Sequence, residues 1–261
     1  MNDVTRPHPR LAVRREGAVL HVRLDAPEKR NAQVPSLWLA LAEIATTLPE
    51  DVRVVVLSGE GASFSAGLDR RMLTPGGVEG EADLTALAVR DEQALADEVE
   101  GFQRAFTAWQ DSHAFVIAAV QGYAIGAGFQ LALAADLRIV ATDVAFVMAE
   151  VSLGLVPDLG GTMALTRLIG ASRALELCLT GRPVGADEAV ATGIASLAVD
   201  PDQLDATAAD LAAAVCEADP DAAREIVALF RGITGRTQAE QLRLEREAQA
   251  RRIAALGRAA R

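Results

Sequence analysis

The sequence has few aromatic residues, histidines and cysteines, and each scarcity excludes a class of protein. Aromatic residues make up 4% of the 261 residues, so the core has to be built from alanine, valine, leucine and isoleucine. None of the three histidines (His8, His21, His113) is spaced with a cysteine or carboxylate as in a metal site, and we therefore expect no metal. Cys178 and Cys216 are far apart and lack a C-x-x-C partner. They indicate free thiols in a reducing compartment rather than a disulfide framework.

Basic side chains are also in deficit, with 25 lysines and arginines against 36 aspartates and glutamates and a formal net charge of -11. This balance argues against general nucleic-acid binding, which needs a basic surface. An acidic protein can still bind an anionic ligand through a local patch of basic side chains or backbone amides. The first ten residues lack the apolar core of a signal peptide, so we expect a cytoplasmic protein.

One uncharged run, residues 114–135, is long enough to cross a membrane. It contains Gln121, Gln130 and three glycines clustered in its middle, which a membrane helix does not favour. We therefore predict a buried strand, a turn and a helix there, and no membrane partner.

Strand patterns alternate with helix patterns along the chain, which favours an α/β fold. We predict a core over residues 1–197 and an all-helical region over 198–261 that serves oligomerisation. Trp38 and Phe102 suit either an acyl tunnel or a subunit contact. The expected elements are a hairpin (11–25), buried strands (52–59, 115–122, 137–141, 144–148), helices (35–48, 91–109, 161–170, 172–181) and a helix followed by a strand (185–200).

Two of the buried strands end in segments rich in small residues, at 65–67 and 126–128. Small residues let a ligand approach the main chain closely, and a helix beginning near Ala127 would aim its positive end at that ligand. Two backbone N–H groups converging on one oxygen would form an oxyanion hole, as an enolate requires. The alternative is that these glycines only permit tight turns. Ser65 has no neighbouring His or Asp motif, which argues against a serine nucleophile.

Five segments occur in a recognisable order and spacing: "PEKRNA", "FSAGLDRRM", "GYAIGAGFQLALAADLRIVA", "AEVSLGLVPDLGGTMALTRLIG" and "ALELCLTGRPVGADEAVATGI". Together they resemble the enoyl-CoA hydratase/isomerase (crotonase) superfamily over about Leu20 to Val199. The resemblance implies a crotonase-like spiral of ββα units with a helical C-terminal trimerisation region, forming homotrimers or homohexamers. It also implies an acyl-CoA thioester as substrate and no separate cofactor, because CoA is part of the substrate.

Carried over by position, the resemblance assigns the oxyanion N–H groups to Leu68 and Ala127. Family members usually have glycine at the position of Ala127. It also assigns a set of residues to the bound CoA. A solvated charged edge is the alternative for the charged members of this set. The set is Lys29, Arg30, Ala66, Asp69, Arg70 and Arg71.

Family hydratases resemble one another in having two glutamates, one matching Glu150 and one at the position of Gln130. An amide can hydrogen-bond a water but cannot take its proton near neutral pH, so Gln130 either positions a group or packs. Glu150 alone can still move a double bond from position 3 to position 2 of an acyl-CoA. Without the resemblance, Glu150 would be interpreted as an exposed charge at a strand end.

Asp158, in "VPDLGGT", is a second acid-base candidate because some dienoyl isomerases resemble this sequence in placing an aspartate in such a turn. Its alternative is an N-terminal cap for the helix that follows. We thus expect an enoyl-CoA isomerase with Glu150 as the acid-base group. The alternatives are a hydratase that uses Glu150 and Gln130, and a non-catalytic acyl-CoA-binding protein.

Overall fold

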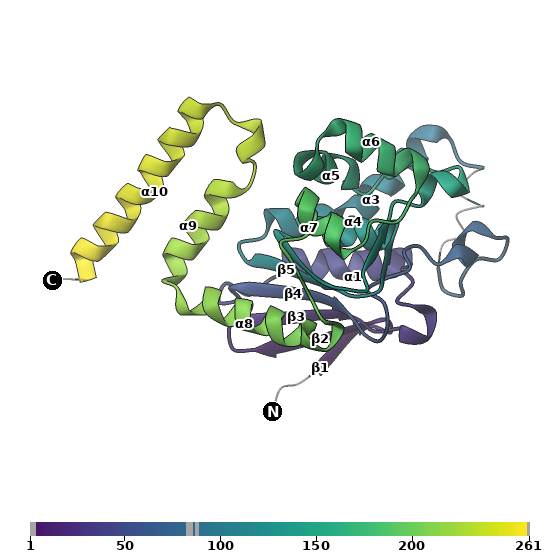
Figure 1. Ribbon diagram of the computed structural model, residues 1–261, viewed down its shortest axis with the longest axis horizontal. Helices are drawn as coiled ribbons and strands as arrows, with labels where there is room; N and C mark the ends of the chain where they lie inside the picture. The colour runs from purple at the N-terminus through teal and green to yellow at the C-terminus, as the bar shows by residue number, and fades with distance from the viewer. Residues whose placement is uncertain (1–3, 82–85, 87–88, 260–261) are drawn as a thin grey trace.

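A computed structural model describes residues 4–81, 86 and 89–259. Its main sheet has seven strands in the order β1-β2-β3-β4-β5-β7-β9, and a second sheet pairs β6 with β8. Helices cover both faces of the main sheet (Figure 1). The strands are β1 (Val4–His8), β2 (Leu11–Glu16), β3 (Val19–Leu24), β4 (Val54–Gly59), β5 (Phe115–Val120), β6 (Tyr123–Ile125), β7 (Leu137–Ala141), β8 (Ala145–Val147) and β9 (Leu197–Val199).

The first three strands are antiparallel and the rest of the main sheet is parallel. The predicted hairpin forms between β2 and β3, with Glu16 opposite Val19. The predicted buried strands β4 and β5 pair in parallel, with Val54 opposite Phe115. Parallel strands need crossover connections, and these connections carry the turns and helices that build the site.

Successive residues of the parallel strands enter two different cores, because side chains alternate between the faces of a sheet. Val55 and Leu57 of β4 pack into the large core beneath the helices of one face. Val54 and Val56 pack instead against α8 on the other face. Because both faces are covered, these strands are continuous apolar runs.

The predicted helices all form, and their ends differ from the predicted bounds by at most two residues. The α-helices are α1 (Pro35–Thr46), α3 (Glu92–Asp111), α4 (Ala127–Ala134), α5 (Gly161–Ile169), α6 (Ala171–Thr180), α7 (Ala186–Thr192), α8 (Leu204–Glu217), α9 (Pro220–Phe230) and α10 (Gln238–Ala259). The 3-10 helices are η1 (Pro27–Lys29), η2 (Arg70–Leu73), η3 (Glu150–Leu153), η4 (Pro201–Gln203) and η5 (Ile233–Gly235).

Some elements differ from the prediction. Strands β1 and β6 were not expected. The strand predicted over 144–148 forms as β8 and pairs in parallel with β6. Trp38 and Phe102, 5% and 7% exposed, pack together in the large core, so neither lines an open surface. Of the acidic stretch 73–100, residues 82–85 and 87–88 lie outside the described residues.

The C-terminal region begins on the sheet and then leaves it. Helix α8 packs against β4, β5 and β7, whereas α9 and α10 lie side by side and project away from the core (Figure 1). An oligomerisation role for residues 198–261 remains a prediction. In the described part of the chain no helix combines the length and the apolar character that crossing a membrane requires. Residues 114–135 contain the predicted buried strand (β5) and helix (α4), with the short strand β6 in the segment where a turn was predicted.

Candidate active site

The two segments of small residues lie against each other. Ser65 N donates to Tyr123 O at 2.9 Å, and Ile125 N donates to Ser65 O at 2.9 Å. Gly67 has a φ of +77°, and a Cβ on it would lie 2.3 Å from Ile125 O and 3.3 Å from Ala127 N. The turn therefore requires glycine here, both for its backbone angle and for the approach of the neighbouring chain.

The predicted oxyanion amides belong to two peptide groups whose carbonyls are fixed. Gln33 N donates to Gly67 O at 2.7 Å, and Gln130 N donates to Gly126 O at 2.9 Å. In a planar trans peptide the N–H points opposite to the carbonyl, so the N–H groups of Leu68 and Ala127 point away from those bonds. The Ala127 N–H also has no intrahelical acceptor, because Ala127 is the first residue of α4.

Glu150 is the first residue of η3 and is 9% exposed. Its Oε1 accepts a hydrogen bond from Gln130 Nε2 at 2.8 Å, whereas its Oε2 is buried with no partner among the described residues. Burial raises the pKa of this carboxyl above its ordinary value, and the hydrogen bond from Gln130 opposes the rise only in part. A Cβ on Gly126 would lie 3.1 Å from Oε1, so the carboxylate lies directly beside the N-terminus of α4.

Gln130 is 1% exposed and links Glu150 to the turn before α5. Its Oε1 accepts from Leu159 N at 2.9 Å and from Gly161 N at 3.1 Å, while its Nε2 faces Glu150. Two backbone donors require the oxygen on their side, which fixes the orientation of the amide. Of the two roles considered for Gln130, the geometry favours positioning: it holds Glu150 Oε1 and leaves Oε2 free.

The interpretation of Asp158 as a helix cap is wrong. The residue before α5 is Gly160, which has no side chain, and the amides of Leu159 and Gly161 donate to Gln130 instead of Asp158. The side chain of Asp158 is half-buried, and burial raises the pKa of its carboxyl. Its charge also raises the pKa of Glu150, so the two predicted acid-base carboxyls are electrostatic neighbours. Gln103 of α3 holds the Asp158 carbonyl at 2.6 Å.

The residues assigned to CoA line one cavity of about 390 Å³. Asp69 differs from the others because its carboxylate accepts from Arg71 and from Arg10, and these bonds lower its pKa to about 2. The positive charge of Arg71 is therefore largely balanced by the Asp69 carboxylate. Arg30 lies 5.8 Å from the Tyr123 ring centroid, a cation–π distance. The lining residues are Lys29, Arg30, Ala32, Ala66, Leu68, Asp69, Arg70, Arg71 and Ile125.

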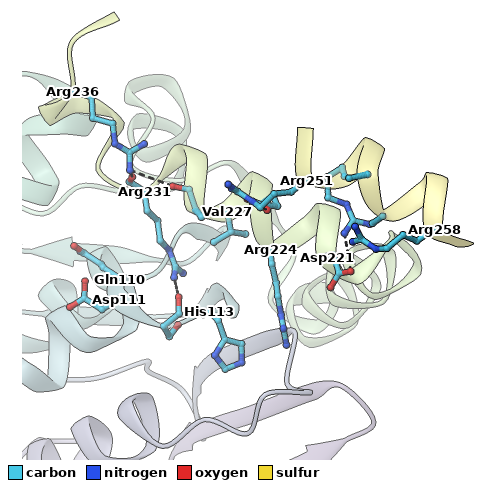
Figure 2. A pocket seen from close by; sticks show the side chains of 16 residues that line it. Gln110, Asp111, His113, Asp221, Arg224, Val227, Arg231, Arg236, Arg251 and Arg258 are labelled. Atoms are coloured by element: carbon cyan, nitrogen blue, oxygen red, sulfur yellow. Dashed lines mark hydrogen bonds and ion pairs between the residues drawn. The ribbon is translucent and has the colours of Figure 1, made fainter. Parts of the chain in front are cut away.

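A larger basic cavity, of about 830 Å³, lies between α9, α10 and the end of α3 (Figure 2). Two of its arginines are already paired with carboxylates: Arg231 binds Asp136 at 2.6 Å, and Arg251 binds Glu225 at 2.6 Å. None of the predicted site residues lines it. The smaller cavity beside Leu68 is therefore the candidate ligand site. No cluster of three or more potential metal ligands occurs among the described residues.

Two residues near the site were not predicted. Gln33, in the segment "NAQVP", binds the turn that contains Gly67, and no motif singles it out. Cys178 on α6 was interpreted only as a free thiol, but burial and the charge of Glu150 raise its pKa, which places it near that carboxylate. Neither position carries a signal in the sequence, because each depends on a contact between distant segments.

The chain is similar to enzymes that act on CoA thioesters. A Thermobifida fusca protein described as an enoyl-CoA hydratase is 41% identical, with a TM-score of 0.90 over 96% of this chain and 95% of that one. A structure in complex with CoA, from the same organism and described in the same way, is 40% identical with a TM-score of 0.89, covering 95% of each chain. The structural neighbours share the predicted crotonase fold.

Curated relatives carry several reaction names. The rat mitochondrial Delta(3,5)-Delta(2,4)-dienoyl-CoA isomerase is 37% identical over 182 residues, which are 68% of this chain and 54% of that protein, so the match spans about half of its length. The carnitinyl-CoA dehydratase of Salmonella arizonae is 35% identical over 231 residues, 87% of this chain and 81% of that protein. The sequence model of the enoyl-CoA hydratase/isomerase family matches residues 14–257. The predicted resemblance is confirmed, and the chain belongs to the enoyl-CoA hydratase/isomerase family of enzymes.

Proposed function

We propose that the protein moves a double bond of an acyl-CoA from position 3 to position 2, with Glu150 as the only acid-base group. One observation carries the proposal: a buried glutamate has one oxygen held by an amide and the other without a partner, beside the N-terminus of α4. A carboxylate with a raised pKa and a free oxygen suits repeated proton transfer.

The steps follow from this arrangement. Glu150 Oε2 takes a proton from C2 of the 3-enoyl thioester, and the electron pair of that C–H bond moves into the C1–C2 bond to give a dienolate. The N–H groups of Leu68 and Ala127 stabilise the negative thioester oxygen. The dienolate then takes the proton back at C4, which leaves the double bond between C2 and C3. The substrate gains and loses no atoms or electrons overall, so the reaction needs no cofactor or water.

The cavity beside Leu68 supports an acyl-CoA substrate. Lys29, Arg30 and Arg70 bring positive charge to an otherwise acidic protein, which suits the phosphates of CoA. The T. fusca neighbour was solved in complex with CoA. Binding the nucleotide here would leave the thioester near Leu68 and the acyl chain directed toward Glu150.

A second candidate is the conversion of a 3,5-dienoyl-CoA to a 2,4-dienoyl-CoA. This reaction moves a proton between C2 and C6, which lie too far apart for one carboxylate. Asp158 supplies the second group, because its carboxyl neighbours Glu150 and its pKa is raised by burial. A dienoyl-CoA isomerase is also among the relatives. Hydration is less favoured, because Gln130 can accept no proton.

The test is to incubate the pure protein with a 3-enoyl-CoA, a 3,5-dienoyl-CoA and a 2-enoyl-CoA and to follow conjugated thioester absorbance. Glu150→Gln should lower the 3-enoyl activity by about 10²- to 10⁴-fold. Asp158→Asn should spare that reaction and slow only the dienoyl reaction. Glu43→Gln, which changes an exposed carboxylate on α1, is the matched control. Loss of 2-enoyl absorbance would instead indicate a hydratase, and binding without turnover would indicate a non-catalytic binder.

A further inference from the structure

Gln33 holds both edges of the segment that presents the Leu68 amide. We call residues 65–69 the oxyanion turn. The backbone N–H of Gln33 donates to Gly67 O at 2.7 Å, and the backbone carbonyl of Gln33 accepts from Asp69 N at 2.8 Å. These two bonds fix the peptide groups on either side of Leu68. The direction of the Leu68 N–H therefore depends on the position of Gln33.

The side chain of Gln33 makes a second connection to the same turn. Its Oε1 accepts from Trp38 Nε1 at 2.7 Å, and its Nε2 donates to Ser65 Oγ at 3.0 Å. Ser65 Oγ also accepts from Gly67 N at 3.1 Å and donates to the carbonyl of Asn31 at 2.8 Å. Because an indole N–H can only donate, every bond in this network has a fixed direction.

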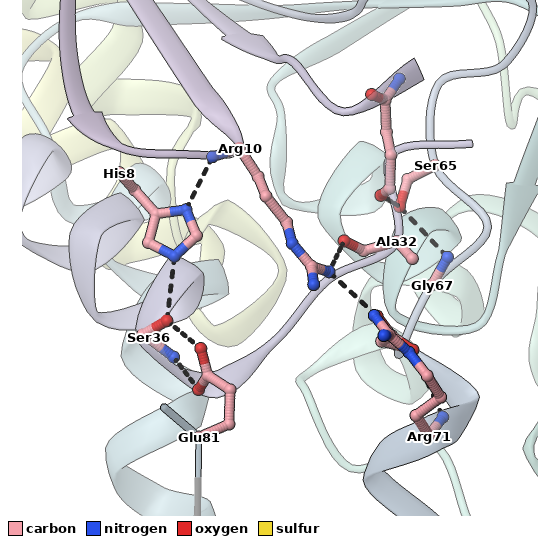
Figure 3. Close-up of polar contacts among 10 residues, drawn as sticks. His8, Arg10, Ala32, Ser36, Ser65, Gly67, Arg71 and Glu81 are labelled. Atoms are coloured by element: carbon pink, nitrogen blue, oxygen red, sulfur yellow. Dashed lines mark hydrogen bonds and ion pairs between the residues drawn. The ribbon is translucent and has the colours of Figure 1, made fainter. Parts of the chain in front are cut away.

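The network determines which backbone amide is left for a ligand. Ser65 Oγ takes the Gly67 N–H, as the dashed line between them shows (Figure 3). The neighbouring Leu68 N–H has no acceptor among the described residues, and Leu68 lines the cavity of about 390 Å³. Gln33 and Ser65 are both 0% exposed, so water cannot replace either partner cheaply.

We propose that Gln33 and Ser65 are positioning residues for the oxyanion hole, which set the direction of the Leu68 N–H toward the thioester oxygen. The inference rests on the proposed function in that it assigns the Leu68 amide to an enolate oxygen. It goes further by naming the side chains that keep this amide in place. Neither residue touches the substrate; both act through the backbone of the oxyanion turn.

Trp38 extends the network to α3. Its ring centroid lies 5.2 Å from that of Phe102 and 5.9 Å from that of Phe106, both on α3. The same helix holds the Asp158 carbonyl through Gln103 at 2.6 Å. One helix therefore contacts both the turn that carries Asp158 and the tryptophan that orients Gln33.

The test uses two variants that each remove one hydrogen-bonding group, Ser65→Ala and Trp38→Phe. Their matched controls are Ser58→Ala, which loses a buried hydroxyl bonded to Arg23 at 3.2 Å, and Trp109→Phe, which loses an indole bond to Ala105 O at 2.8 Å. Displacing one oxyanion donor should lower kcat by about 10- to 100-fold. KM and the Kd for a CoA ester should change by less than about threefold, because phosphate contacts are untouched.

A second measurement distinguishes positioning from loss of stability. A bound 2,4-dienoyl-CoA should absorb at longer wavelength than the free ligand, because the oxyanion donors polarise its carbonyl. We expect Ser65→Ala and Trp38→Phe to reduce this shift and the controls to retain it. If Ser65→Ala does not fold, Trp38→Phe carries the test, since it keeps an aromatic ring in the same place.

The outcomes separate the two proposals. A wild-type protein that shifts the dienoyl absorbance but turns over no substrate contradicts the proposed function alone, and the variants still test positioning. Unchanged kcat and unchanged shift in both variants overturn the positioning role. Equal losses in the variants and their controls overturn it as well, because they would show a general effect of stability. A wild-type protein that binds without any shift also overturns it.

Discussion

Replacing Gln130 by glutamate tests the central contact of the site. One oxygen of the new carboxylate can still accept from Leu159 N and Gly161 N, because those donors face an oxygen already. The other would replace Nε2, which lies 2.8 Å from Glu150 Oε1. A favourable hydrogen bond would thus become a contact between two carboxylates.

The magnitude follows from the charges. Two unit charges about 4 Å apart repel by about 4 kcal/mol at an effective dielectric constant of about 20, and the lost hydrogen bond adds about 1 kcal/mol. The folded pair relieves the repulsion by keeping a proton that the separate carboxyls of the unfolded chain release. The folded state then binds more protons than the unfolded state, so the stability of Gln130→Glu should fall as the pH rises.

Urea unfolding of the wild type and Gln130→Glu at about pH 5 and about pH 8 measures this cost, which should be clearly larger at the higher pH. The double variant Gln130→Glu/Glu150→Gln exchanges the amide and the carboxylate, and should recover most of the stability at pH 8. A cost that is equal at both pH values, or that the exchange does not reduce, would refute the contact. The single variant should also add water to a 2-enoyl-CoA faster than the wild type. No gain would contradict the view that the amide limits hydration.

Three further predictions concern the same site. The kcat/KM of the wild type should fall as the pH is lowered, because only the carboxylate form of Glu150 can take a proton. The midpoint of this fall should lie above pH 4.5, the ordinary pKa of a glutamate, because burial raises the pKa of Glu150. A midpoint at or below pH 4.5 in a pH–rate profile would contradict the role. Asp69→Asn should lower the free energy of unfolding by about 2 kcal/mol near neutral pH, as measured in denaturant, because the pKa of Asp69 falls from 3.8 to about 2 in the folded state. This stabilisation is present at pH values above 3.8 and is lost as the pH falls toward 2. A cost that does not change with pH would count against the ion pairs. Gly67→Ala should abolish isomerisation and destabilise the protein by more than the roughly 1–2 kcal/mol that a side chain costs at a positive φ. Gly17→Ala should cost only that amount, because Gly17 has a φ of +58° and open space around it. Equal costs for the two variants in denaturant unfolding would exclude the close packing at Gly67.

The sequence predicted those elements whose signal is local. The apolar runs of β4 and β5 and the helix that begins at Ala127 lie where expected, because hydrophobic patterning and small residues mark them directly. The short strand β6 was missed: it has three residues, which pair with β8 and bridge to Ser65, so it lacks the length that a pattern needs.

The contacts within the site needed the structure. Asp before a helix is usually a cap, yet at Asp158 the amides of the turn are taken by Gln130, which is 28 residues earlier in the chain. The roles of Gln33 and Arg10 likewise depend on partners from other segments. A sequence shows which groups are available, whereas which donor reaches which acceptor is settled by packing between segments.

The strand order of the main sheet has a consequence for how the protein is made and how it changes. Each main-sheet strand pairs with the main-sheet strand before it in the chain, so a nascent chain leaving the ribosome can complete every pair without waiting for its far end. The connections between strands are correspondingly free to lengthen, since no main-sheet pairing depends on their length. The stretch between β4 and β5 holds both the oxyanion turn and the acidic segment, and new substrate preferences can evolve there while the sheet stays the same.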